Sequence, residues 1–367
     1  MQKQLYIFSD TIIRRKDNTL LCEQILEENR DCEEENTSPE KGYENGEIDR
    51  GEFFLDERAI IPIGDKKYIP VENIESIYSF GSIHFNTRFL YFLSMNRIPL
   101  HVFNYNGNYA GSFSTADRNI NGLILLQQVE NYKCNSKRLY IAKQIITGAA
   151  GNTLANLKYH QNRGADLTDE IEYINELLGD FGNIQSVGEL MGYEGIIKKT
   201  YYECWKKIFK QPVSFTHRVK HPPDNLINSL ISYGNAIIYS ICLDQIYQTR
   251  LYPEIGFIHE PNEGKLALAY DLSEIFKPLI TDRVIFKVIN KMMISENDFV
   301  KRNGTGWIKK PAKKIFVQEF DAKLLQKINI RENGISMSYR RVIKEECYKL
   351  LKHIKGEEEY QPYTSRW

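Results

Sequence analysis

Several features are missing from this chain of 367 residues, and each absence narrows the class of protein. No uninterrupted run of about 20 apolar residues occurs, so we expect no transmembrane helix. The least polar stretch, 226–243, is interrupted by Asn, Ser and Tyr. The first residues, MQKQLYIFSD, lack the positive and then apolar layout of a signal peptide. We therefore expect a cytoplasmic protein with no membrane partner.

Common cysteine and enzyme signatures are missing as well. The six cysteines lie far apart and form no Cys-X-X-Cys pair, which favours reduced thiols over disulfides or a zinc site. The chain contains no GxxxxGK[ST], GxGxxG, HExxH or GxSxG motif. These absences argue against nucleotide hydrolysis, dinucleotide redox chemistry, zinc proteolysis and esterase chemistry. The hydrophobic share of 42% and the charged share of 26% are those of a globular protein.

The chain has no net charge, yet its charges are unevenly distributed. Residues 1–60 hold 8 Lys and Arg against 16 Asp and Glu, so the remainder carries a net charge of +8. A basic body suits a polyanionic partner, but it also suits a merely solvated surface. The acidic stretch at about 24–56 is poor in apolar residues, and we interpret it as a mobile insertion between strands.

The sequence pattern changes near residue 115. Short apolar runs before it predict strands, and Asn106-Gly107 between two such runs predicts a hairpin. Long segments after it show helical periodicity and are separated by prolines. We therefore predict an α+β protein of more than one domain, with an N-terminal β domain at 1–115 and a larger all-α domain at 116–367.

One predicted helix, 188–209, places the carboxylate of Glu194 on its apolar stripe. The stripe runs through Ile197, Tyr201, Cys204 and Ile208, and a step of three residues back from Ile197 reaches Glu194. Gly192 and Gly195 on either side would let a backbone or a ligand approach closely. A buried charge is costly unless it is paired or binds a metal, so Glu194 is either a ligand or an ion-paired residue at the stripe's edge.

A second cluster begins at Gly256-Phe257-Ile258-His259 and continues into a predicted helix. Asp271, Glu274 and Lys277 follow one another at intervals of three residues, along one edge of that helix. Taken separately, the helix could carry an exposed salt-bridge ladder and the histidine could be structural. Taken together, a histidine and two carboxylates suit an oxygen-preferring cation that tolerates one imidazole, namely Mn²⁺ or Mg²⁺.

A basic loop precedes the long predicted helix at 224–249. It contains Arg218 and Lys220, followed by the pair Pro222-Pro223, with Asp224 as the expected helix N-cap. The loop is equally consistent with a phosphate-binding segment and with a solvated turn.

In order and at this spacing, these pieces resemble a known family, the universal CRISPR-associated integrase that inserts new spacers. The resemblance spans nearly the whole chain. Its best-marked pieces are Tyr193-Glu194-Gly195, Arg218…Pro222-Pro223-Asp224-Asn225…Asn228-Ser229-Leu230-Ile231-Ser232-Tyr233-Gly234, Gly256-Phe257-Ile258-His259 and Asp271-Leu272-Ser273-Glu274-Ile275-Phe276-Lys277-Pro278. The ending, Glu359-Tyr360-Gln361-Pro362…Trp367, is similar to a subgroup tied to Cascade-type (type I) interference systems.

The resemblance implies an N-terminal β-sandwich domain, a helical catalytic domain and a homodimer formed mainly through the β domains. It implies Mg²⁺ or Mn²⁺ bound by Glu194, His259 and Glu274, with Asp271 as a supporting residue or an alternative ligand. Lys277 matches a basic active-site residue, and Tyr239 matches a tyrosine near the DNA path. The implied partners are double-stranded and branched DNA and a small ferredoxin-fold CRISPR-associated protein.

The implied reaction is phosphoryl transfer on DNA, in which a 3′-hydroxyl or water attacks a phosphodiester. In that reading Arg218, Lys220 and Tyr239 contact DNA, and the three ligands are not nucleophiles. Two alternatives remain, a DNA-binding scaffold with a degenerate site and a metal-dependent hydrolase of a small substrate. The hydrolase would leave the basic residues Arg218, Lys220, Lys309, Lys310, Lys313 and Lys314 without a purpose.

Overall fold

The computed structural model describes residues 3–24, 66–104, 107–114, 121–220, 222–263, 265–302, 305–330 and 335–365. The chain forms two compact units, the first made of 1–105 with 110–116 and the second of 106–109 with 117–367. Nearly all of the acidic insertion expected at about 24–56 lies outside the described residues.

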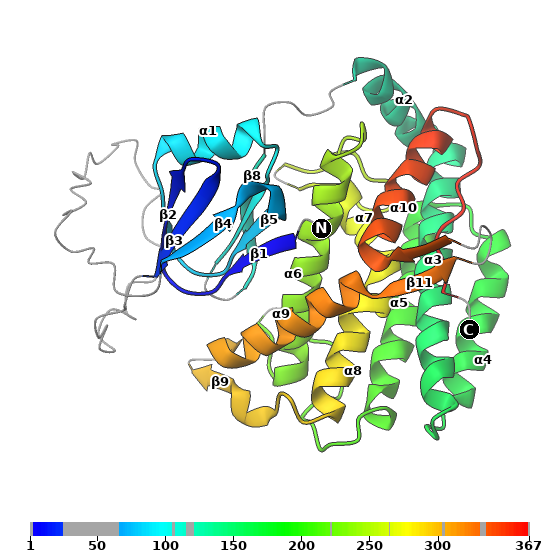
Figure 1. The fold of residues 1–367 in the computed structure, drawn as a ribbon. Coiled ribbons are helices and arrows are strands. Elements are labelled where there is room, and N and C mark those ends of the chain that lie inside the picture. The colour runs from blue at the N-terminus through cyan, green and yellow to red at the C-terminus, as the bar shows by residue number, and fades with distance from the viewer. Residues whose placement is uncertain are drawn as a thin grey trace, which may run out of the picture. The chain divides into compact units, whose positions relative to one another are not determined.

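The first unit consists of two four-stranded sheets and one helix (Figure 1). One sheet has the order β1-β5-β7-β8 and the other has the order β4-β3-β2-β6. Strand β1 pairs in parallel with β5, and β2 pairs antiparallel with β3. The elements are β1 (Lys3–Ile7), β2 (Thr11–Lys16), β3 (Thr19–Gln24), β4 (Lys67–Pro70), β5 (Ile74–Ser79), β6 (Ile83–His84), α1 (Thr87–Met95), β7 (Leu100–Phe103) and β8 (Tyr109–Phe113).

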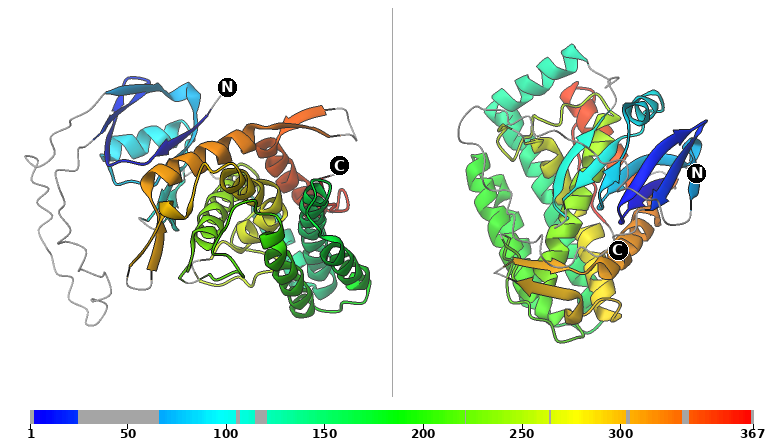
Figure 2. Two further views of the ribbon diagram at one scale, coloured as in Figure 1. Left: turned by 90° about the horizontal axis from the view of Figure 1, so that it is seen from below. Right: turned by 90° about the vertical axis from the view of Figure 1, so that its left-hand side faces the viewer.

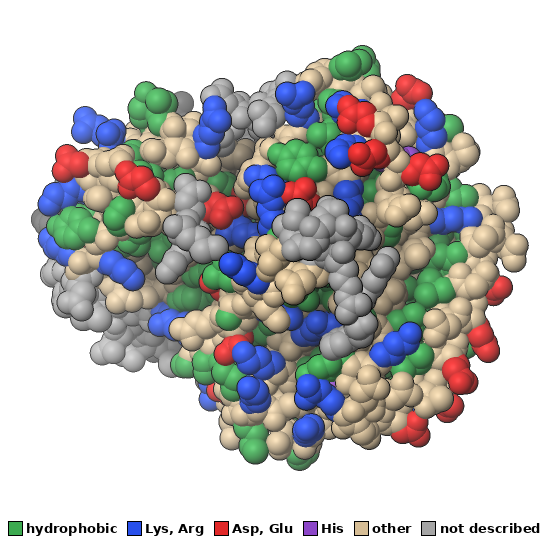
Figure 3. All heavy atoms as spheres, turned by 45° about the vertical axis from the view of Figure 1, so that its right-hand side comes forward, with side chains coloured by type: hydrophobic (Ala, Val, Ile, Leu, Met, Phe, Trp, Pro, Cys, Tyr) green, Lys and Arg blue, Asp and Glu red, His purple; other side chains and the backbone are tan. Residues whose placement is uncertain are grey.

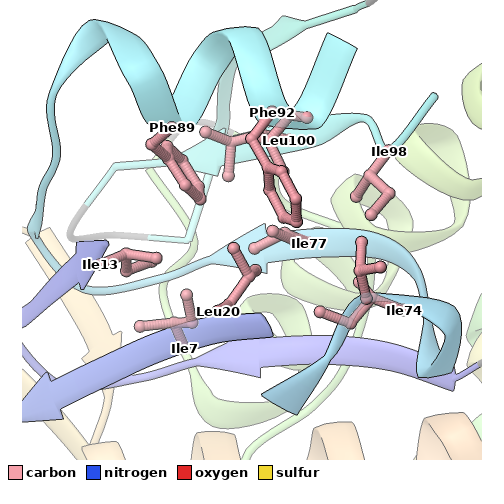
Figure 4. Packing of buried hydrophobic residues seen from close by; sticks show 11 residues of the cluster. Ile7, Ile13, Leu20, Ile74, Ile77, Phe89, Phe92, Ile98 and Leu100 are labelled. Atoms are coloured by element: carbon pink, nitrogen blue, oxygen red, sulfur yellow. The ribbon is translucent and has the colours of Figure 1, made fainter. Parts of the chain in front are cut away.

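Both sheets and the helix contribute to one hydrophobic core in this unit. Ile7 and Ile77 come from the first sheet, Ile13 and Leu20 come from the second, and Phe89 comes from α1 (Figure 4). Asn86 caps α1 by accepting a hydrogen bond of 3.2 Å from the amide of Phe89. The apolar residues of these strands are therefore buried between the sheets and the helix, as expected for a β domain with its own core.

Strands β2 and β3 form a hairpin. Arg14, Arg15 and Lys16 are polar but continue β2, and only Asp17-Asn18 forms the turn. Asp17 has a positive φ of 53°, which Asp tolerates better than most residues. Of the predicted Asn106-Gly107 hairpin, Asn106 lies outside the described residues, and Gly107 has a φ of 86°.

The second unit is mainly helical, so the predicted fold class, strands followed by helices, is confirmed. Helix α7 packs against both α3 and α6, and α3 also packs against α5 (Figure 1). The helices are α2 (Gly122–Lys133), α3 (Asn135–Gln161), α4 (Thr168–Gly179), α5 (Val187–Glu203), α6 (Leu226–Tyr247), α7 (Ala267–Phe276), α8 (Arg283–Asn290), α9 (Lys310–Leu325) and α10 (Tyr339–Ile354). A π-helical turn, Pro278–Asp282, joins α7 to α8.

This unit is not purely α-helical, which corrects one detail of the prediction. Two short hairpins occur, β9 (Phe299–Arg302) with β10 (Thr305–Ile308) and β11 (Lys327–Ile330) with β12 (Ile335–Ser338). They flank α9 in the chain, and Figure 2 shows them projecting near its two ends. Each hairpin has only four residues a strand, too few for a clear alternating pattern in the sequence.

Helix α6 is long and rich in apolar residues. By length and composition alone it could cross a membrane, but 83% of its most apolar window is buried inside the folded chain. It is therefore the core helix of this unit. Its N-cap is Asn225 rather than the expected Asp224, because the Asn225 side chain accepts the 2.9 Å hydrogen bond from the amide of Asn228.

Candidate active site

Helix α5 presents Glu194 toward the interior of the second unit. The buried residues of α5 are Leu190, Ile197 and Tyr201, and Glu194 shares their side of the helix, with its side chain 20% exposed. Among the described residues, no atom lies within 4 Å of a Cβ built on Gly192 or Gly195, so the expected close approach of a ligand there stays a prediction.

Helix α7 supplies three ionisable side chains, as the spacing predicted. Asp271 and Glu274 are buried, and Lys277 follows at the helix end. The exposed salt-bridge ladder considered from the sequence is therefore wrong for this helix. Pro278 has no N–H group to continue the helical hydrogen bonds, so the chain widens into the π-helical turn, in which the amide of Asp282 bonds to the carbonyl of Lys277 at 3.1 Å.

A lysine joins the carboxylates of the two helices. The ammonium of Lys198 on α5 binds Glu274 at 2.8 Å and also forms an ion pair with Glu194, four residues earlier on α5. Lys277 binds the other oxygen of Glu274 at 2.6 Å. Glu194 is therefore ion-paired, which is one of the two alternatives drawn from the sequence, and its role as a metal ligand stays a prediction. The sequence analysis missed Lys198, although its spacing of four from Glu194 was the available signal.

The electrostatics of this group follow from burial and pairing. Burial disfavours the charge of Glu274, but the two ammonium groups outweigh it and hold the pKa of Glu274 far below its usual value. Burial also opposes the charge of Lys198, yet Glu274 and Glu194 raise its pKa. Burial lowers the pKa of Lys277, despite its bond to Glu274. Glu274 is therefore held as a carboxylate.

These side chains line a small pocket of about 30 Å³, roughly the space of one water or one ion. Glu194, Lys198, Glu274 and Lys277 share its wall with Asp282. Asp282 is buried and accepts a hydrogen bond of 3.0 Å from the hydroxyl of Tyr201. Burial raises the pKa of Asp282 to about 7, although the bond from Tyr201 opposes this. Asp282 was not among the site residues predicted from the sequence, because it belongs to none of the motifs recognised there.

His259 is held by the helix that carries Glu274. Its Nδ1 lies 2.7 Å from Oδ1 of Asp271. Asp271 also accepts backbone N–H bonds from Phe257, Ile258 and His259, at 2.5, 3.0 and 3.1 Å. In the neutral imidazole, a bond to the carboxylate places the hydrogen on Nδ1 and leaves the lone pair on Nε2. The His259 side chain is 40% exposed.

The loop reaches Asp271 only because residue 256 is a glycine. A Cβ at Gly256 would lie 2.8 Å from Oδ2 of Asp271 and 2.8 Å from Cβ of Ala267. Asp271 thus binds the loop and the imidazole through both of its oxygens.

The three residues expected to contact DNA differ in how exposed their side chains are. Lys220 is exposed. Arg218 is half-buried, and it donates hydrogen bonds to the Asn228 side chain at 3.2 Å and to the Ser232 hydroxyl at 2.9 Å, both on α6. Tyr239 is buried, with its ring 4.3 Å from that of Tyr270. Arg218 and Tyr239 therefore support the fold around the site, and only Lys220 presents its charge to solvent.

Glu194, Glu274 and His259 are ligands of the right chemical type for a divalent ion, but in this structure they do not lie close enough together to bind one. Two carboxylates and one imidazole with a free Nε2 are ligands that Mg²⁺ and Mn²⁺ accept. However, over the described ranges no three His, Cys, Asp or Glu side chains lie close enough together to hold a metal ion. Lys198 stands between Glu194 and Glu274 and binds the oxygens that an ion would use. An ion bound by all three residues must therefore displace this ammonium.

Comparison with known proteins places the chain in a family. A family model described as "CRISPR associated protein Cas1" matches residues 54–322. A protein of Fusobacterium nucleatum named "CRISPR-associated endonuclease Cas1" is 41% identical over 328 residues, which cover 89% of this chain and 96% of that protein. A protein of Thermodesulfovibrio yellowstonii named "CRISPR-associated endonuclease Cas1 2" is 37% identical over the full length of both chains.

Solved structures agree with this placement. The structure of a CAS1 protein from Thermotoga maritima matches with a TM-score of 0.77 and 31% identity, covering 99% of this chain and 100% of that one. A casposase bound to integration product matches with a TM-score of 0.80 and 19% identity, covering 99% and 94%, so it shares the fold. The resemblance drawn from the sequence motifs is confirmed, and the chain belongs to the Cas1 family of CRISPR-associated proteins.

Proposed function

We propose that this chain is a metal-dependent DNA endonuclease and integrase that inserts new spacers into a CRISPR array. The observation that carries the proposal is the meeting of Glu194 from α5 and Glu274 from α7 in one pocket, with His259 held by Asp271 on the same α7. Membership of a family whose relatives are named endonucleases supports the reaction class.

In this proposal Glu194, Glu274 and Nε2 of His259 hold Mg²⁺ or Mn²⁺. When bound, the ion would polarise the phosphate oxygens and lower the pKa of the attacking hydroxyl. Asp271 keeps the hydrogen of His259 on Nδ1 and so keeps Nε2 available. Lys277, and Lys198 once it leaves the two carboxylates, lie where they can neutralise the charge that develops on the scissile phosphate.

We propose DNA, both double-stranded and branched, as the substrate and partner. The net charge of +8 after residue 60 supplies non-specific attraction to its backbone. On the face shown in Figure 3, Lys and Arg side chains are spread widely and are interspersed with Asp and Glu. The homodimer and the small ferredoxin-fold partner are proposed on the resemblance alone.

The test is cleavage and strand transfer on branched DNA, with Mn²⁺, Mg²⁺ or EDTA. The wild type is compared with Glu194→Ala and His259→Ala, and Glu263→Ala at an exposed acid serves as the control. We expect activity only with metal, a loss of at least 100-fold in both site variants and unchanged DNA binding. Site variants as active as the wild type would show that the ligands are misplaced.

A second function is favoured by one specific observation. Lys198 and Lys277 already neutralise Glu274, an arrangement that would also suit a DNA-binding scaffold without catalysis. The same experiment separates the two functions, because a scaffold binds branched DNA tightly but neither cuts nor joins it under any metal condition.

A further inference from the structure

The segment Tyr360–Ser365 is fixed to the second unit by a buried carboxylate. Glu346 of α10 is fully buried and accepts a hydrogen bond of 2.7 Å from the hydroxyl of Tyr360. It also accepts the backbone amide of Tyr363 at 3.1 Å. Tyr360 itself is completely buried, which anchors one end of the segment.

Helix α3 is shaped to receive this segment. A Cβ on Gly148 would lie 2.6 Å from Cβ of Pro362, and a Cβ on Gly151 would lie 3.2 Å from Cγ2 of Thr364. Two glycines on one helix therefore make room for two residues of the segment, Pro362 and Thr364. A side chain at Gly148 would push Pro362 away from the helix.

Asn152, the next residue of α3, joins this segment to the helix of the candidate site. Its Oδ1 accepts the backbone amide of Ser365 at 2.7 Å. Its Nδ2 donates to the carbonyl of Tyr363 at 3.0 Å and to the carbonyl of Ile275 on α7 at 2.9 Å. Asn152 is fully buried, and Ile275 directly follows Glu274. One side chain thus bonds both the segment and the backbone beside Glu274.

The backbone at the end of α7 lacks one regular helical hydrogen bond because of Pro278. A proline has no N–H group, so the carbonyl of Glu274 cannot receive its usual hydrogen bond from residue 278. Asn156, one turn further along α3, donates to the carbonyl of Pro278 at 2.5 Å. Two asparagines on α3 therefore bond the backbone at Ile275 and at Pro278, and Asn152 is also bonded to the segment.

We propose that Asn152 is a positioning residue through which the segment Tyr360–Ser365 fixes the end of α7, and with it Glu274 and Lys277. The catalytic importance of α7 rests on the proposed function, but the mechanical link does not. The link is therefore tested first by a measurement that needs neither DNA nor metal.

The experiment is hydrogen–deuterium exchange of the full chain, read at peptides of α7 and of α4. Asn152→Ala removes the link, while Gly148→Ala disturbs the segment and leaves Asn152 in place. Tyr140→Phe removes a bond from Tyr140 to the carbonyl of Tyr360 that does not lead to α7. Gly122→Ala is the control for a helical glycine, since nothing lies within 4 Å of a Cβ there.

We expect Asn152→Ala and Gly148→Ala each to speed exchange in α7 by about tenfold or more, with α4 unchanged. Their double variant should exchange no faster than the single Asn152→Ala variant, because both changes act through one link. The two control variants should match the wild type. An unchanged α7, an equal increase in α4 or additive effects would each overturn the proposal.

Activity is the second measurement. If the proposed function holds, Gly148→Ala lowers kcat for strand transfer by at least tenfold and leaves the affinity for DNA unchanged. An inactive wild type would contradict the proposed function and leave the exchange result to decide the link. A wild-type kcat together with fast exchange in α7 would overturn the catalytic part of the inference.

Discussion

Lys198 shows how one side chain can determine the charge state of a site. Its ammonium binds both Glu194 and Glu274, and it is 38% exposed, whereas Glu274 is only 6% exposed. Glu274 therefore depends on its two lysines to remain charged in a buried place. Without Lys198, Lys277 would remain as the one cation that binds Glu274 among the described residues.

We expect Lys198→Met to lower the free energy of unfolding by about 1–3 kcal/mol at pH 7, less than for a fully buried pair because Lys198 is partly exposed. The lowered pKa of Glu274 contributes stability above its ordinary value of 4.5, and this stability is lost as the pH falls below that value. The difference between variant and wild type should therefore shrink below pH 4.5. Denaturant unfolding at several pH values measures it.

The neighbouring Lys199 is the matched control for that prediction. It is 75% exposed and lies 4.0 Å from Glu203, away from the pocket. Lys199→Met should change stability by less than about 0.5 kcal/mol. Equal effects of the two substitutions would contradict the role assigned to Lys198.

Asp271 makes a second prediction for a single residue. Asp271→Asn keeps the size of the side chain but points an NH₂ group at N–H donors that need an acceptor. We expect a loss of about 2–3 kcal/mol of stability, since each buried N–H left unsatisfied costs about 1–3 kcal/mol. Thermal unfolding of Asp271→Asn measures this loss, and Glu263→Gln, at an exposed acid, is the control. Equal melting temperatures for the two variants would contradict the expectation.

The helices could be predicted from the sequence because their apolar residues recur with helical spacing. The spacing put Asp271, Glu274 and Lys277 on one face of α7 and Glu194 on the inner side of α5. It could not show that Lys198 would reach α7, because that contact depends on how α5 and α7 pack. It also missed the break at Cys134 between α2 and α3, where no glycine or proline marks the boundary.

The last turn of helix α3 contains His160, whose protonation should make the stability of this helix depend on pH. A helix C-terminus ordinarily favours a protonated histidine. At His160, however, burial and the nearby cations Arg163, Arg283 and Lys210 together lower the pKa to about 4. The folded state thus binds fewer protons than the unfolded state, so this helix should lose stability as the pH falls from about 6.5 to 4.

His160→Asn removes this titration, and the variant should lose less stability between pH 7 and pH 4 than the wild type. A shift of this size corresponds to on the order of 3 kcal/mol, and partial exposure of His160 reduces the expected difference to about 1–2 kcal/mol. Far-UV circular dichroism during denaturant unfolding follows the helical unit. His217→Asn, at an exposed histidine, is the control. Parallel pH profiles for wild type and His160→Asn would refute the prediction.

The charge distribution of the whole chain leads to the remaining prediction. Since the chain after residue 60 carries a net charge of +8, its affinity for DNA should fall steeply with salt. If six or more phosphates are contacted, the affinity falls by about 10³-fold or more between 50 and 200 mM salt. Exposed lysines contribute to this slope in proportion to their phosphate contacts, whereas side chains engaged within the fold do not.

Lys220 and Arg218 form a matched pair for testing that idea. Lys220 is exposed, so Lys220→Ala should reduce the slope of log affinity against log salt by about 1, equally for every DNA sequence. Arg218 is bonded to Asn228 and Ser232, so Arg218→Ala should lower stability and leave the slope unchanged. Fluorescence anisotropy over a salt series measures the slopes, and thermal unfolding measures stability. The opposite pattern would mean that Arg218 leaves α6 to bind phosphate, because only a released guanidinium can displace counterions from DNA.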